Sequence, residues 1–548
     1  MPLQKNQVLT LRVERLSSDG SGVAHSPDGE TVFIPGAAPG DEARVRIVKD
    51  CKRYAFGILD EVLTPSPDRI PVDCAVAGPC GGCSLRHLDY AAELRAKQEN
   101  VADAFARIGG LDVPVLPIVG SPEVNRYRNK VQFPVGVDKS GKPCIGFYAG
   151  RTHRIVPCPD CRLQPGVLNE IGNALCAFFA EKGIQPYSEE TGRGLVRHIF
   201  LRRGAHSGQI MVCLVCTRAR LPSAEELCTR LKAQFAEITT ILLNVNAKNT
   251  NVILGTETHT LYGQGYIEDT LCGVPVQLGP LSFYQVNTLA AEQLYGIAAQ
   301  YAQLTPDDLL LDLYCGMGTI GLSMAAHCRE LIGVEIVPEA IESAKANAAR
   351  MGADVAAKSR FFCADAGQAA TRLAAEGLHP DIVMLDPPRK GCDEATLSAV
   401  VRMSPRRVVY VSCNPATAAR DAAWLEQNGY HAEKVQPVDL FPRTRHCEAV
   451  LLLTKLHVDR HIEVEVSMDE LDVTAAESKA TYDQIRYYVW EHYQLKVSNL
   501  YIAQVKQKHG IIERENYHKA KNENAKQPKC PKEKEDAIVE ALKHFQMI

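Results

Sequence analysis

Residues 309–321 read LLLDLYCGMGTIG, an apolar run that ends in a glycine-rich loop. Gly316, Gly318 and Gly321 have the G-x-G-x-x-G spacing of a loop that connects a strand to a helix and approaches a nucleotide cofactor. Glu335 ends the next apolar run, at a place where an acid can bind ribose hydroxyls. The spacing favours a nucleotide-type cofactor, although a tight turn that only requires glycines would produce the same pattern.

The strand-then-helix pattern continues to residue 455 and sets the fold class. Apolar, β-branched runs alternate with helical segments such as EAIESAKANAARMG. Strands that alternate with helices form a parallel, doubly wound sheet. The expected strands lie at residues 308–316, 330–336, 359–365, 381–388 and 406–414. We predict an α/β, Rossmann-like domain over residues 296–456.

Three further domains are expected around this one in a multidomain protein. Residues 1–65 alternate short β-rich runs with turns such as SSDGSG, the pattern of a small antiparallel β-barrel. Residues 66–295 begin with a proline-rich linker and a cysteine cluster and then mix strands with helices, which predicts an α+β domain. Residues 457–548 contain two amphipathic helical patterns and predict a small, mostly helical extension.

The overall composition restricts the class of protein. The 548 residues carry a formal net charge of −4, so a nucleic-acid-binding surface has to be a local basic patch. The 19 cysteines are spread along a long chain whose N-terminus lacks the apolar core of a signal peptide, which indicates reduced thiols. No apolar stretch reaches the ~18 residues of a membrane helix. We expect a soluble, cytoplasmic protein without a membrane partner.

Two predicted strands end in chemically reactive side chains. MLDPPRKG places Asp386, and VYVSCNP places Cys413, at the carboxyl ends where an open α/β sheet binds its ligands. Hydride transfer has no need for this thiol, whereas methyl transfer to C5 of uracil does, because that carbon is a weak nucleophile. A thiolate that adds at C6 turns the ring into an enolate and makes C5 nucleophilic. The alternative for Cys413 is a buried structural cysteine.

A base must then remove the C5 proton. The run FPRTRHCEAVLLL offers Glu448 at the start of a predicted strand, with His446 two residues earlier. A glutamate at this place is also commonly a solvated charge at the rim of a sheet, so the residues alone leave the role of Glu448 open.

Four motifs, DLYCGMG, LDPPRKG, SCNPAT and HCEAV, occur in this order and together resemble the RNA uracil-5 methyltransferase family, which uses S-adenosylmethionine. The resemblance implies that Cys413 is the nucleophile, that Glu448 is the base, and that Asp386 binds near cofactor and uracil. It also implies that Phe283 in LSFYQVN stacks on a base, as an enzyme that unstacks its target requires. The implied cofactor-binding residues are Gln285, Tyr314, Gly316, Gly318, Thr319, Glu335, Asp365 and Asp386.

A second constellation is CAVAGPCGGC, in which Cys74, Cys80 and Cys83 have C-x5-C-x2-C spacing. Three sulfur ligands need a fourth, and VPCPDCRLQ offers Cys158 and Cys161. By spacing alone the group can bind zinc or an iron-sulfur cluster. Ribosomal-RNA members of the family carry a [4Fe-4S] cluster on such cysteines. The resemblance implies Cys161 as the fourth ligand, and Cys158 departs from the family pattern.

Basic residues beside aromatic ones mark candidate RNA-contacting segments. The N-terminal barrel resembles the TRAM domain, an RNA-binding module of the oligonucleotide-binding barrel type, and its basic-aromatic group is Lys49, Lys52, Arg53 and Tyr54. The run NRYRNKVQF is the stronger candidate for an RNA path, because charges of one sign interleave with aromatics. Its predicted substrate-binding residues are Arg126, Arg128 and Lys130.

The C-terminal extension is basic. Residues 479–548 contain 13 Lys and Arg and nine Asp and Glu, a net charge of +4. Ser498 can cap a helix that carries Lys506 and Lys508, which suggests a helix-turn-helix-like RNA-contacting module. A protein-docking domain is an equal alternative.

Together the motifs predict S-adenosylmethionine-dependent methylation of C5 of a uridine in 23S ribosomal RNA, with RNA as partner and no DNA partner expected. The cysteine cluster favours ribosomal RNA over a transfer-RNA uracil-54-type activity, because transfer-RNA members of the family typically lack it. The alternatives from other classes are a non-catalytic RNA-binding or assembly factor and a NAD-dependent dehydrogenase. Only the glycine loop supports the dehydrogenase.

Overall fold

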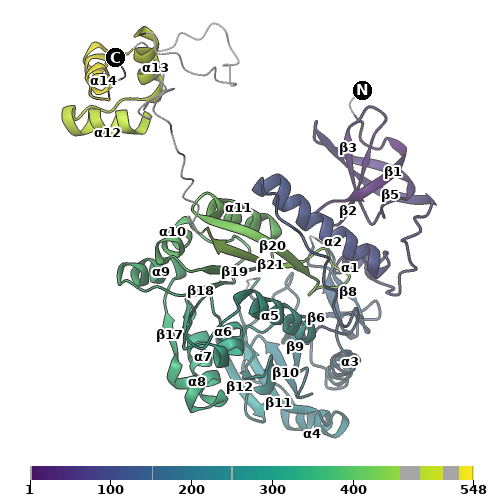
Figure 1. Cartoon of the computed structure of the whole chain (residues 1–548). Helices are drawn as coiled ribbons and strands as arrows, with labels where there is room; N and C mark the ends of the chain where they lie inside the picture. The colour runs from purple at the N-terminus through teal and green to yellow at the C-terminus, as the bar shows by residue number, and fades with distance from the viewer. Residues whose placement is uncertain are drawn as a thin grey trace. The chain divides into compact units, whose positions relative to one another are not determined.

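The computed structural model describes residues 3–150, 152–248, 251–456, 482–509, 530–545 and 547. The chain divides into two compact units, Met1–Val458 and Asp459–Ile548. The first unit contains a closed barrel, a central sheet, a two-stranded hairpin and a C-terminal sheet (Figure 1). Each helix in the described ranges is too short or too polar to cross a lipid bilayer.

The N-terminal barrel is closed by five strands in the order β1-β2-β3-β5-β4. The strands are β1 (Val8–Leu16), β2 (Ser21–His25), β3 (Thr31–Pro35), β4 (Glu42–Asp50) and β5 (Tyr54–Thr64). Val13, Val32 and Val45 lie in its interior, and a Cβ at Gly57 would lie only 2.3 Å from Val45 Cγ1. The predicted barrel is confirmed, with one difference: β3 and β5 pair in parallel.

A helical linker connects the barrel to the rest of the first unit. It consists of α1 (Ala77–Cys80), α2 (Tyr90–Ala104) and a π-helix, η1 (Phe105–Gly109). Asp89 caps α2 by accepting a hydrogen bond from the backbone N–H of Ala92. Val101 and Phe105 are buried in the same apolar cluster as Ala419 and Ala422, so α2 and η1 pack on α11 (Pro415–Glu426) of the C-terminal sheet.

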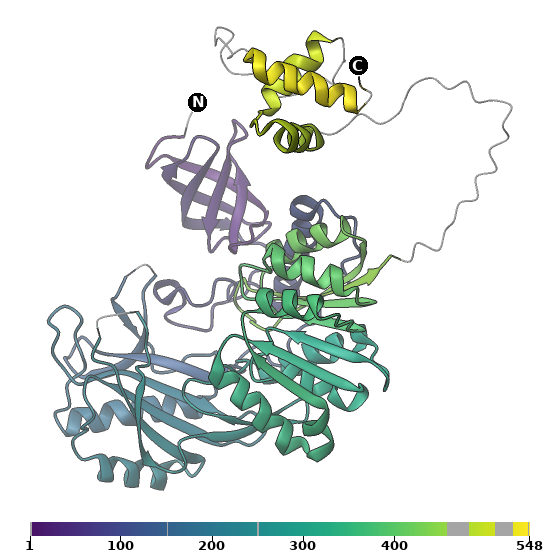
Figure 2. The same cartoon turned by 90° about the vertical axis from the view of Figure 1, so that its left-hand side faces the viewer.

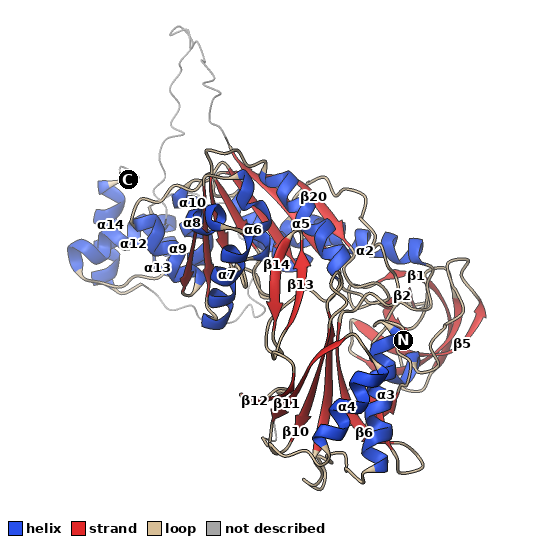
Figure 3. Cartoon of the chain, turned by 90° about the horizontal axis from the view of Figure 1, so that it is seen from below, coloured by secondary structure: helices blue, strands red, loops and turns tan. Residues whose placement is uncertain are grey.

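The central sheet has seven strands in the order β12-β11-β10-β9-β6-β7-β8. They are β6 (Lys130–Val137), β7 (Pro143–Tyr148), β8 (Ile155–Pro157), β9 (Val196–Arg203), β10 (Ile210–Cys216), β11 (Ile238–Val245) and β12 (Glu257–Tyr262). Helices α3 (Gly166–Glu181) and α4 (Ala224–Gln234) cover one face, where Phe133 and Leu201 are buried (Figure 3). Phe200 and Met211 lie on the opposite face, toward the C-terminal sheet.

The hairpin of β13 (Ile267–Leu271) and β14 (Val274–Leu278), followed by α5 (Thr288–Ala302), lies between the two large sheets. Leu271, Val276 and Leu294 belong to the same buried cluster as Phe200 of the central sheet and Leu310 of the C-terminal sheet. This shared apolar core holds the two sheets together, and the segment between β14 and α5 is brought to their junction.

The C-terminal sheet has the order β17-β16-β15-β18-β19-β21-β20. Its strands are β15 (Leu309–Leu313), β16 (Glu330–Glu335), β17 (Ser359–Cys363), β18 (Ile382–Leu385), β19 (Arg407–Ser412), β20 (Tyr430–Val438) and β21 (Glu448–Lys455). The five predicted strands are present and parallel. The last strand, β21, lies between β19 and β20. It runs antiparallel to both, a direction that the sequence pattern did not predict.

Helices lie on both faces of this sheet (Figure 2). Those that follow β15 to β19 are α6 (Thr319–Met324), η2 (Ala325–His327), α7 (Pro338–Met351), α8 (Ala353–Lys358), α9 (Ala366–Ala375), α10 (Glu394–Met403) and α11. Leu310 and Val409 are buried with α5 and α6 on one face, and Leu311 and Val408 with α9, α10 and α11 on the other. This is the doubly wound arrangement that the alternation of strands and helices predicts.

The second unit contains α12 (Tyr482–Tyr493), α13 (Asn499–Lys508) and α14 (Lys532–His544). Its buried core includes Ile485, Val489, Ile502, Ile538 and Leu542. Ser498 caps α13, as predicted. Lys506 is buried, so it is not available at the surface for RNA, whereas Lys508 is exposed and forms an ion pair with Glu535. Residues 457–481 of the predicted extension lie outside the described residues.

Candidate active site

The glycine-rich loop turns tightly at the carboxyl end of β15. Gly318 has a φ of +80°, a conformation that side chains rarely adopt. Gly321 N donates a hydrogen bond to Asp312 Oδ2 at 3.0 Å, and a Cβ at Gly321 would lie 2.8 Å from the same oxygen. Burial raises the pKa of Asp312 to about 8. The sequence motifs did not indicate Asp312. Its buried carboxyl group in β15 holds the end of the loop through the hydrogen bond from Gly321.

Glu335 and Asp365 lie on the same edge as this loop, because β16 pairs with β15 and β17 pairs with β16. Glu335 Oε2 accepts a hydrogen bond from Gly316 N at 3.2 Å. Asp365 follows β17 and caps α9 by accepting from Gln368 N at 3.1 Å. Parallel strands place their carboxyl ends along one edge, so the glycine loop and both acids border one crevice of the sheet.

Tyr295 of α5 interacts with three predicted residues from other parts of the chain: Gln285, Thr319 and Asp386. Its hydroxyl lies 3.5 Å from Thr319 Oγ1 and also hydrogen-bonds the side chain of Gln285. Burial, and then the charge of Asp386, raises the pKa of Tyr295. The hydroxyl of Tyr314, another predicted residue, is 3.4 Å from Thr396 Oγ1. Tyr295 carries no recognisable motif and was not predicted from the sequence.

Cys413 lies directly after β19, where the chain turns into α11. Asn414 caps this helix by accepting a hydrogen bond from Ala416 N at 3.2 Å, and Pro415 occupies its first turn. Asn414 Nδ2 also donates to the carbonyl of Arg389 at 3.0 Å, which ties the loop after β18 to the loop after β19. The strand therefore stops at the thiol because the next two residues begin a helix.

Cys413, Asp386 and Glu448 interact electrostatically, so the structure brings the three predicted catalytic side chains into one site. Burial raises the pKa of Cys413 to about 11, and the charges of Glu448 and Asp386 act in the same direction. Burial raises the pKa of Asp386 to about 7 and that of Glu448 to about 8. Acids that titrate near neutral pH are suited to exchange protons with a substrate.

Arg389 is the cation of this site. Its charge lowers the pKa values of both Cys413 and Glu448, opposing the effect of burial. Arg389 follows Asp-Pro-Pro in the run MLDPPRKG, and no role was predicted for it from the sequence.

Phe283 is presented to solvent by a loop that the central sheet holds. Its side chain is 71% exposed. Two hydrogen bonds of 2.7 Å run from Arg202 to the loop, from Nη1 to the Gly279 carbonyl and from Nη2 to the Ser282 carbonyl. Asn129 Nδ2 donates to the backbone carbonyl of Gln285 at 2.8 Å. An exposed aromatic ring on a braced loop is suited to stack on an unpaired base.

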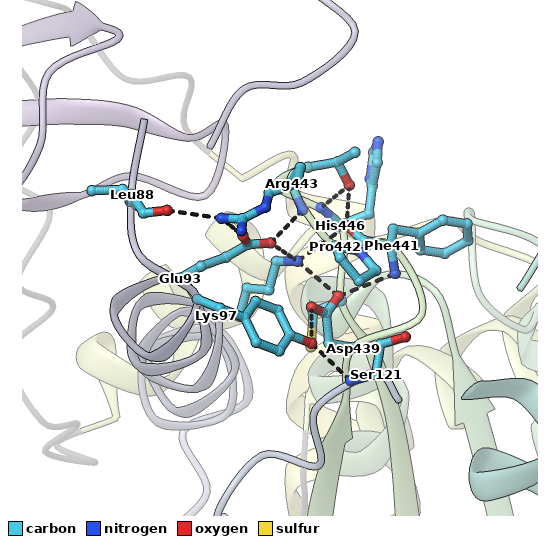
Figure 4. A network of polar contacts seen from close by, with 12 residues as sticks. Leu88, Glu93, Lys97, Ser121, Asp439, Phe441, Pro442, Arg443 and His446 are labelled. Carbon is cyan, nitrogen blue, oxygen red and sulfur yellow. Dashed lines mark hydrogen bonds and ion pairs between the residues drawn. The ribbon is translucent and has the colours of Figure 1, made fainter. Parts of the chain in front are cut away.

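The loop that leads into Glu448 is held by a buried ionic network (Figure 4). Lys97 Nζ of α2 lies 2.7 Å from Asp439 Oδ1 and 2.8 Å from Glu93 Oε1. All three side chains are at most 1% exposed. Arg443 N donates to Glu93 Oε1 at 2.7 Å. The linker helix therefore fixes the backbone of the segment between β20 and β21, and with it the start of β21.

The three predicted RNA-contacting residues differ in their surroundings. The guanidinium of Arg126 is engaged within the protein: it pairs with Asp160 at 2.8 Å and donates to the carbonyl of Cys161, also at 2.8 Å. Arg128 and Lys130 are half-buried on the way to β6 and at its start. Arg128 lies near enough to His446 for its charge to lower the pKa of that ring.

The predicted metal-binding cysteines approach one another from two distant segments. Beyond the effect of burial, the charges of Cys161 and Cys74 raise the pKa of Cys80, and those of Cys161 and Cys80 raise the pKa of Cys83. A Cβ at Gly82 would lie 3.4 Å from Cys80 Sγ, so the glycine leaves room for the backbone beside sulfur.

These cysteines do not form a metal site in this structure. Within the described ranges, no group of three or more His, Cys, Asp or Glu side chains is arranged to hold a metal ion. The Cys158 thiol instead donates a hydrogen bond to Cys161, which lowers the pKa of Cys161 to about 6. The described residues therefore show a domain with converging thiols and do not show the expected iron-sulfur cluster.

Comparison with known proteins assigns the chain. Residues 206–456 match the tRNA (uracil-5-)-methyltransferase family, and residues 2–59 match the TRAM domain. An uncharacterized RNA methyltransferase of Halalkalibacterium halodurans is 43% identical over 453 residues, covering 82% of this chain and 98% of that protein. The chain belongs to this family of RNA uracil-5 methyltransferases. The predicted family and the predicted TRAM barrel are thereby confirmed.

Two further relatives support the family assignment. An uncharacterized RNA methyltransferase of Oceanobacillus iheyensis is 41% identical over 455 residues, 83% of this chain and 98% of that protein. The structure of the Pyrococcus abyssi tRNA (uracil-54, C5)-methyltransferase with S-adenosyl-L-homocysteine has a TM-score of 0.65 and 26% identity, covering 81% of this chain and all of that one. Family membership implies an RNA substrate and S-adenosylmethionine as methyl donor.

Proposed function

We propose that this protein methylates C5 of a uridine in 23S ribosomal RNA through a covalent adduct with Cys413. The observation that carries the proposal is the meeting of Cys413, Asp386 and Glu448 in one site, in which Glu448 is buried and the other two are half-buried, with Arg389 as its cation. A thiol at this edge is required for attack on C6 of a pyrimidine. Methylation of an exocyclic amine, or RNA binding without catalysis, would give this thiol no chemical role.

The reaction follows from the groups in the site. The thiol of Cys413 loses its proton to solvent, and the thiolate forms a bond to C6 of uracil, which leaves an enolate across C4 and C5. S-adenosylmethionine supplies an electrophilic methyl group, which C5 takes as S-adenosylhomocysteine departs. Glu448 then removes the C5 proton, the C6–S bond breaks, and 5-methyluridine and the thiolate are released. Asp386 binds close to the methyl donor and the uracil.

The cofactor is proposed to lie along the carboxyl edge of β15 to β18. The glycine loop, with Gly316 and Gly318, approaches the methionine part, and Glu335 accepts hydrogen bonds from the ribose hydroxyls. The other proposed contacts are Gln285, Tyr314, Thr319, Asp365 and Asp386. Phe283 is proposed to stack on a base of the substrate, and Arg126, Arg128 and Lys130 to line its path.

The choice of ribosomal RNA rests on the cysteines. Four thiols match the donor chemistry of a [4Fe-4S] cluster, and we assign Cys74, Cys80, Cys83 and Cys161 as its ligands, with Cys158 as the departure from the family pattern. The cluster would join the segment before α2 to the segment after β8, without a redox role. Transfer RNA is the second candidate substrate, because the similar Pyrococcus abyssi enzyme is named for uracil-54 of transfer RNA.

We further propose the division into functional domains that the sequence suggests. Residues 1–65 form the TRAM barrel, 66–295 the central RNA-binding domain, 296–456 the methyltransferase domain and 457–548 the helical extension.

The test is mass spectrometry of RNA and protein after incubation with S-adenosylmethionine and transcripts of ribosomal and transfer RNA. We expect 5-methyluridine in ribosomal RNA from the wild type, no product from Cys413→Ala, and an accumulated protein–RNA adduct from Glu448→Gln. Cys228→Ala, in the distant helix α4, is the matched control and should remain fully active. Product from transfer RNA alone would establish the second candidate, and an active Cys413→Ala would overturn the covalent mechanism.

A further inference from the structure

Lys130 and Arg202 lie directly opposite each other on the antiparallel strands β6 and β9. Opposed residues of such a pair project from the same face of the sheet, so the two cations are neighbours. Arg202 is only 1% exposed, and Lys130 is half-buried. Two like charges directly opposite each other destabilise a sheet, so this arrangement calls for a compensating group.

Within the described ranges, no carboxylate forms an ion pair with either cation. The terminal nitrogens of Arg202 donate to the carbonyls of Gly279 and Ser282, while its Nε is buried without a partner. Arg128, two residues before Lys130, also has a buried Nε without a partner. In the part of the chain that the structure describes, none of these three cations forms an ion pair with a carboxylate.

The nearby arginine charges help to lower the pKa of the Lys130 ammonium. Burial lowers the pKa of Lys130 to about 8, and the charges of Arg202 and Arg128 act in the same direction. A bound oxyanion would offset the repulsion from both arginines and keep the ammonium charged.

We propose that Arg128, Lys130 and Arg202 form a binding site for one phosphate group of the substrate RNA. This inference rests on the proposed RNA substrate and adds a specific contact to it. The site adjoins the base-stacking surface, because Arg202 holds the carbonyl of Ser282, the residue before Phe283. One nucleotide can therefore be held by its phosphate at the central sheet and by a base at Phe283.

The carboxylate of S-adenosylmethionine is the other oxyanion near this junction. The glycine loop, Glu335 and Asp365 all belong to the C-terminal sheet, whereas Lys130 and Arg202 belong to the central sheet. This separation favours the RNA phosphate, and the two sources give different results in a binding experiment.

The experiment compares Lys130→Met and Lys130→Arg with the wild type in the full-length protein. Lys139→Met, an exposed lysine in the turn after β6, is the matched control. Binding of a fluorescein-labelled 23S ribosomal RNA transcript is followed by anisotropy between about 50 and about 300 mM KCl, because each lost phosphate contact lowers the salt dependence. Binding of S-adenosylmethionine to each variant is measured by calorimetry.

For Lys130→Met we expect the slope of log K against log salt to fall in magnitude by about 1, with several-fold weaker RNA binding at low salt. Lys130→Arg should keep the wild-type slope, and all variants should bind S-adenosylmethionine equally. An unchanged slope for Lys130→Met overturns the proposal. So does a loss of S-adenosylmethionine affinity without a change in slope, which would assign the site to the cofactor carboxylate. Methylation by the wild type is scored separately, so failure of this site is distinguishable from failure of the proposed function.

Discussion

Lys97 and Asp439 are 342 residues apart in the chain, yet the Lys97 ammonium lies 2.7 Å from the Asp439 carboxylate in the interior of the protein. Burial alone would lower the pKa of Lys97, but the carboxylates of Asp439 and Glu93 outweigh it and raise the pKa. The Lys97 ammonium therefore keeps its charge in the interior. The pair connects the linker helix α2 to the segment that begins β21, and so joins the N-terminal part of the chain to the residue proposed as base.

Removing the cation should destabilise the first unit strongly. In Lys97→Met, two buried carboxylates lose their shared partner, and breaking a buried ion pair in this way costs about 3 to 5 kcal/mol. Urea and thermal denaturation would measure the loss. Lys345→Met is the control, because Lys345 pairs with Glu342 on an exposed helix surface, where such pairs contribute at most about 1 kcal/mol. Equal stability of the two variants would contradict an ionised, buried network.

The thiol of Cys413 should become more acidic when Glu448 is neutralised. The charge of Glu448 is the second cause, after burial, of the raised pKa of Cys413, about 11. Glu448→Gln removes that charge, so the pH at which Cys413 becomes a thiolate should shift downward. Alkylation of the Cys413 peptide by iodoacetamide, followed by mass spectrometry across pH 7 to about 11, measures this shift.

The remaining thiols provide the internal control for that experiment. Cys363 is exposed at the end of β17, so its alkylation profile should be the same in both proteins. A Cys413 profile that is unaltered in Glu448→Gln would mean that the two groups do not interact.

Asp312→Asn should be more stable than the wild type at higher pH, and the difference in stability should grow as the pH rises. Burial raises the folded-state pKa of Asp312 to about 8, above its value in the unfolded chain. The wild type therefore loses stability between about pH 4 and about pH 8, because the acid ionises in the unfolded chain while the folded protein keeps it protonated. Asparagine stays neutral and can still accept the hydrogen bond from Gly321. Melting temperatures of both proteins at several pH values provide the measurement, and a difference that does not vary with pH would count against a buried neutral acid.

The cysteine assignment makes a prediction that does not involve activity. Anaerobic reconstitution with iron and sulfide should load roughly four iron atoms per chain and give visible absorption from sulfur-to-iron charge transfer. Cys161→Ser should lose most of this absorption and Cys158→Ser should retain it. Loss in Cys158→Ser alone would make Cys158 the fourth ligand, and no iron uptake by the wild type would remove the cluster from the proposal.

Local sequence patterns were sufficient to predict the five parallel strands of the C-terminal sheet and the edge at which their reactive residues lie. The glycine loop, Asp386 and Cys413 each follow an apolar strand, and parallel strands bring such ends together whatever the rest of the chain does. The turn from Cys413 into α11 is equally local, because Asn414 and Pro415 are residues that begin helices. The same holds for the barrel, whose strands alternate with turn residues over a short span.

Tertiary packing alone decided the contacts between distant segments. Tyr295 and Asp312 are polar groups that become buried only when other elements cover them, and Arg389 is placed beside Cys413 by the pairing of two loops. The Lys97–Asp439 pair and the Lys130–Arg202 opposition depend on how α2 docks and on the register of β6 with β9. Hydrophobic periodicity does not predict such contacts. Their energy depends on burial and on neighbours that are distant in the chain. The sequence by itself determined the strands and the chemistry at their ends, and the tertiary structure determined which charges share an interior.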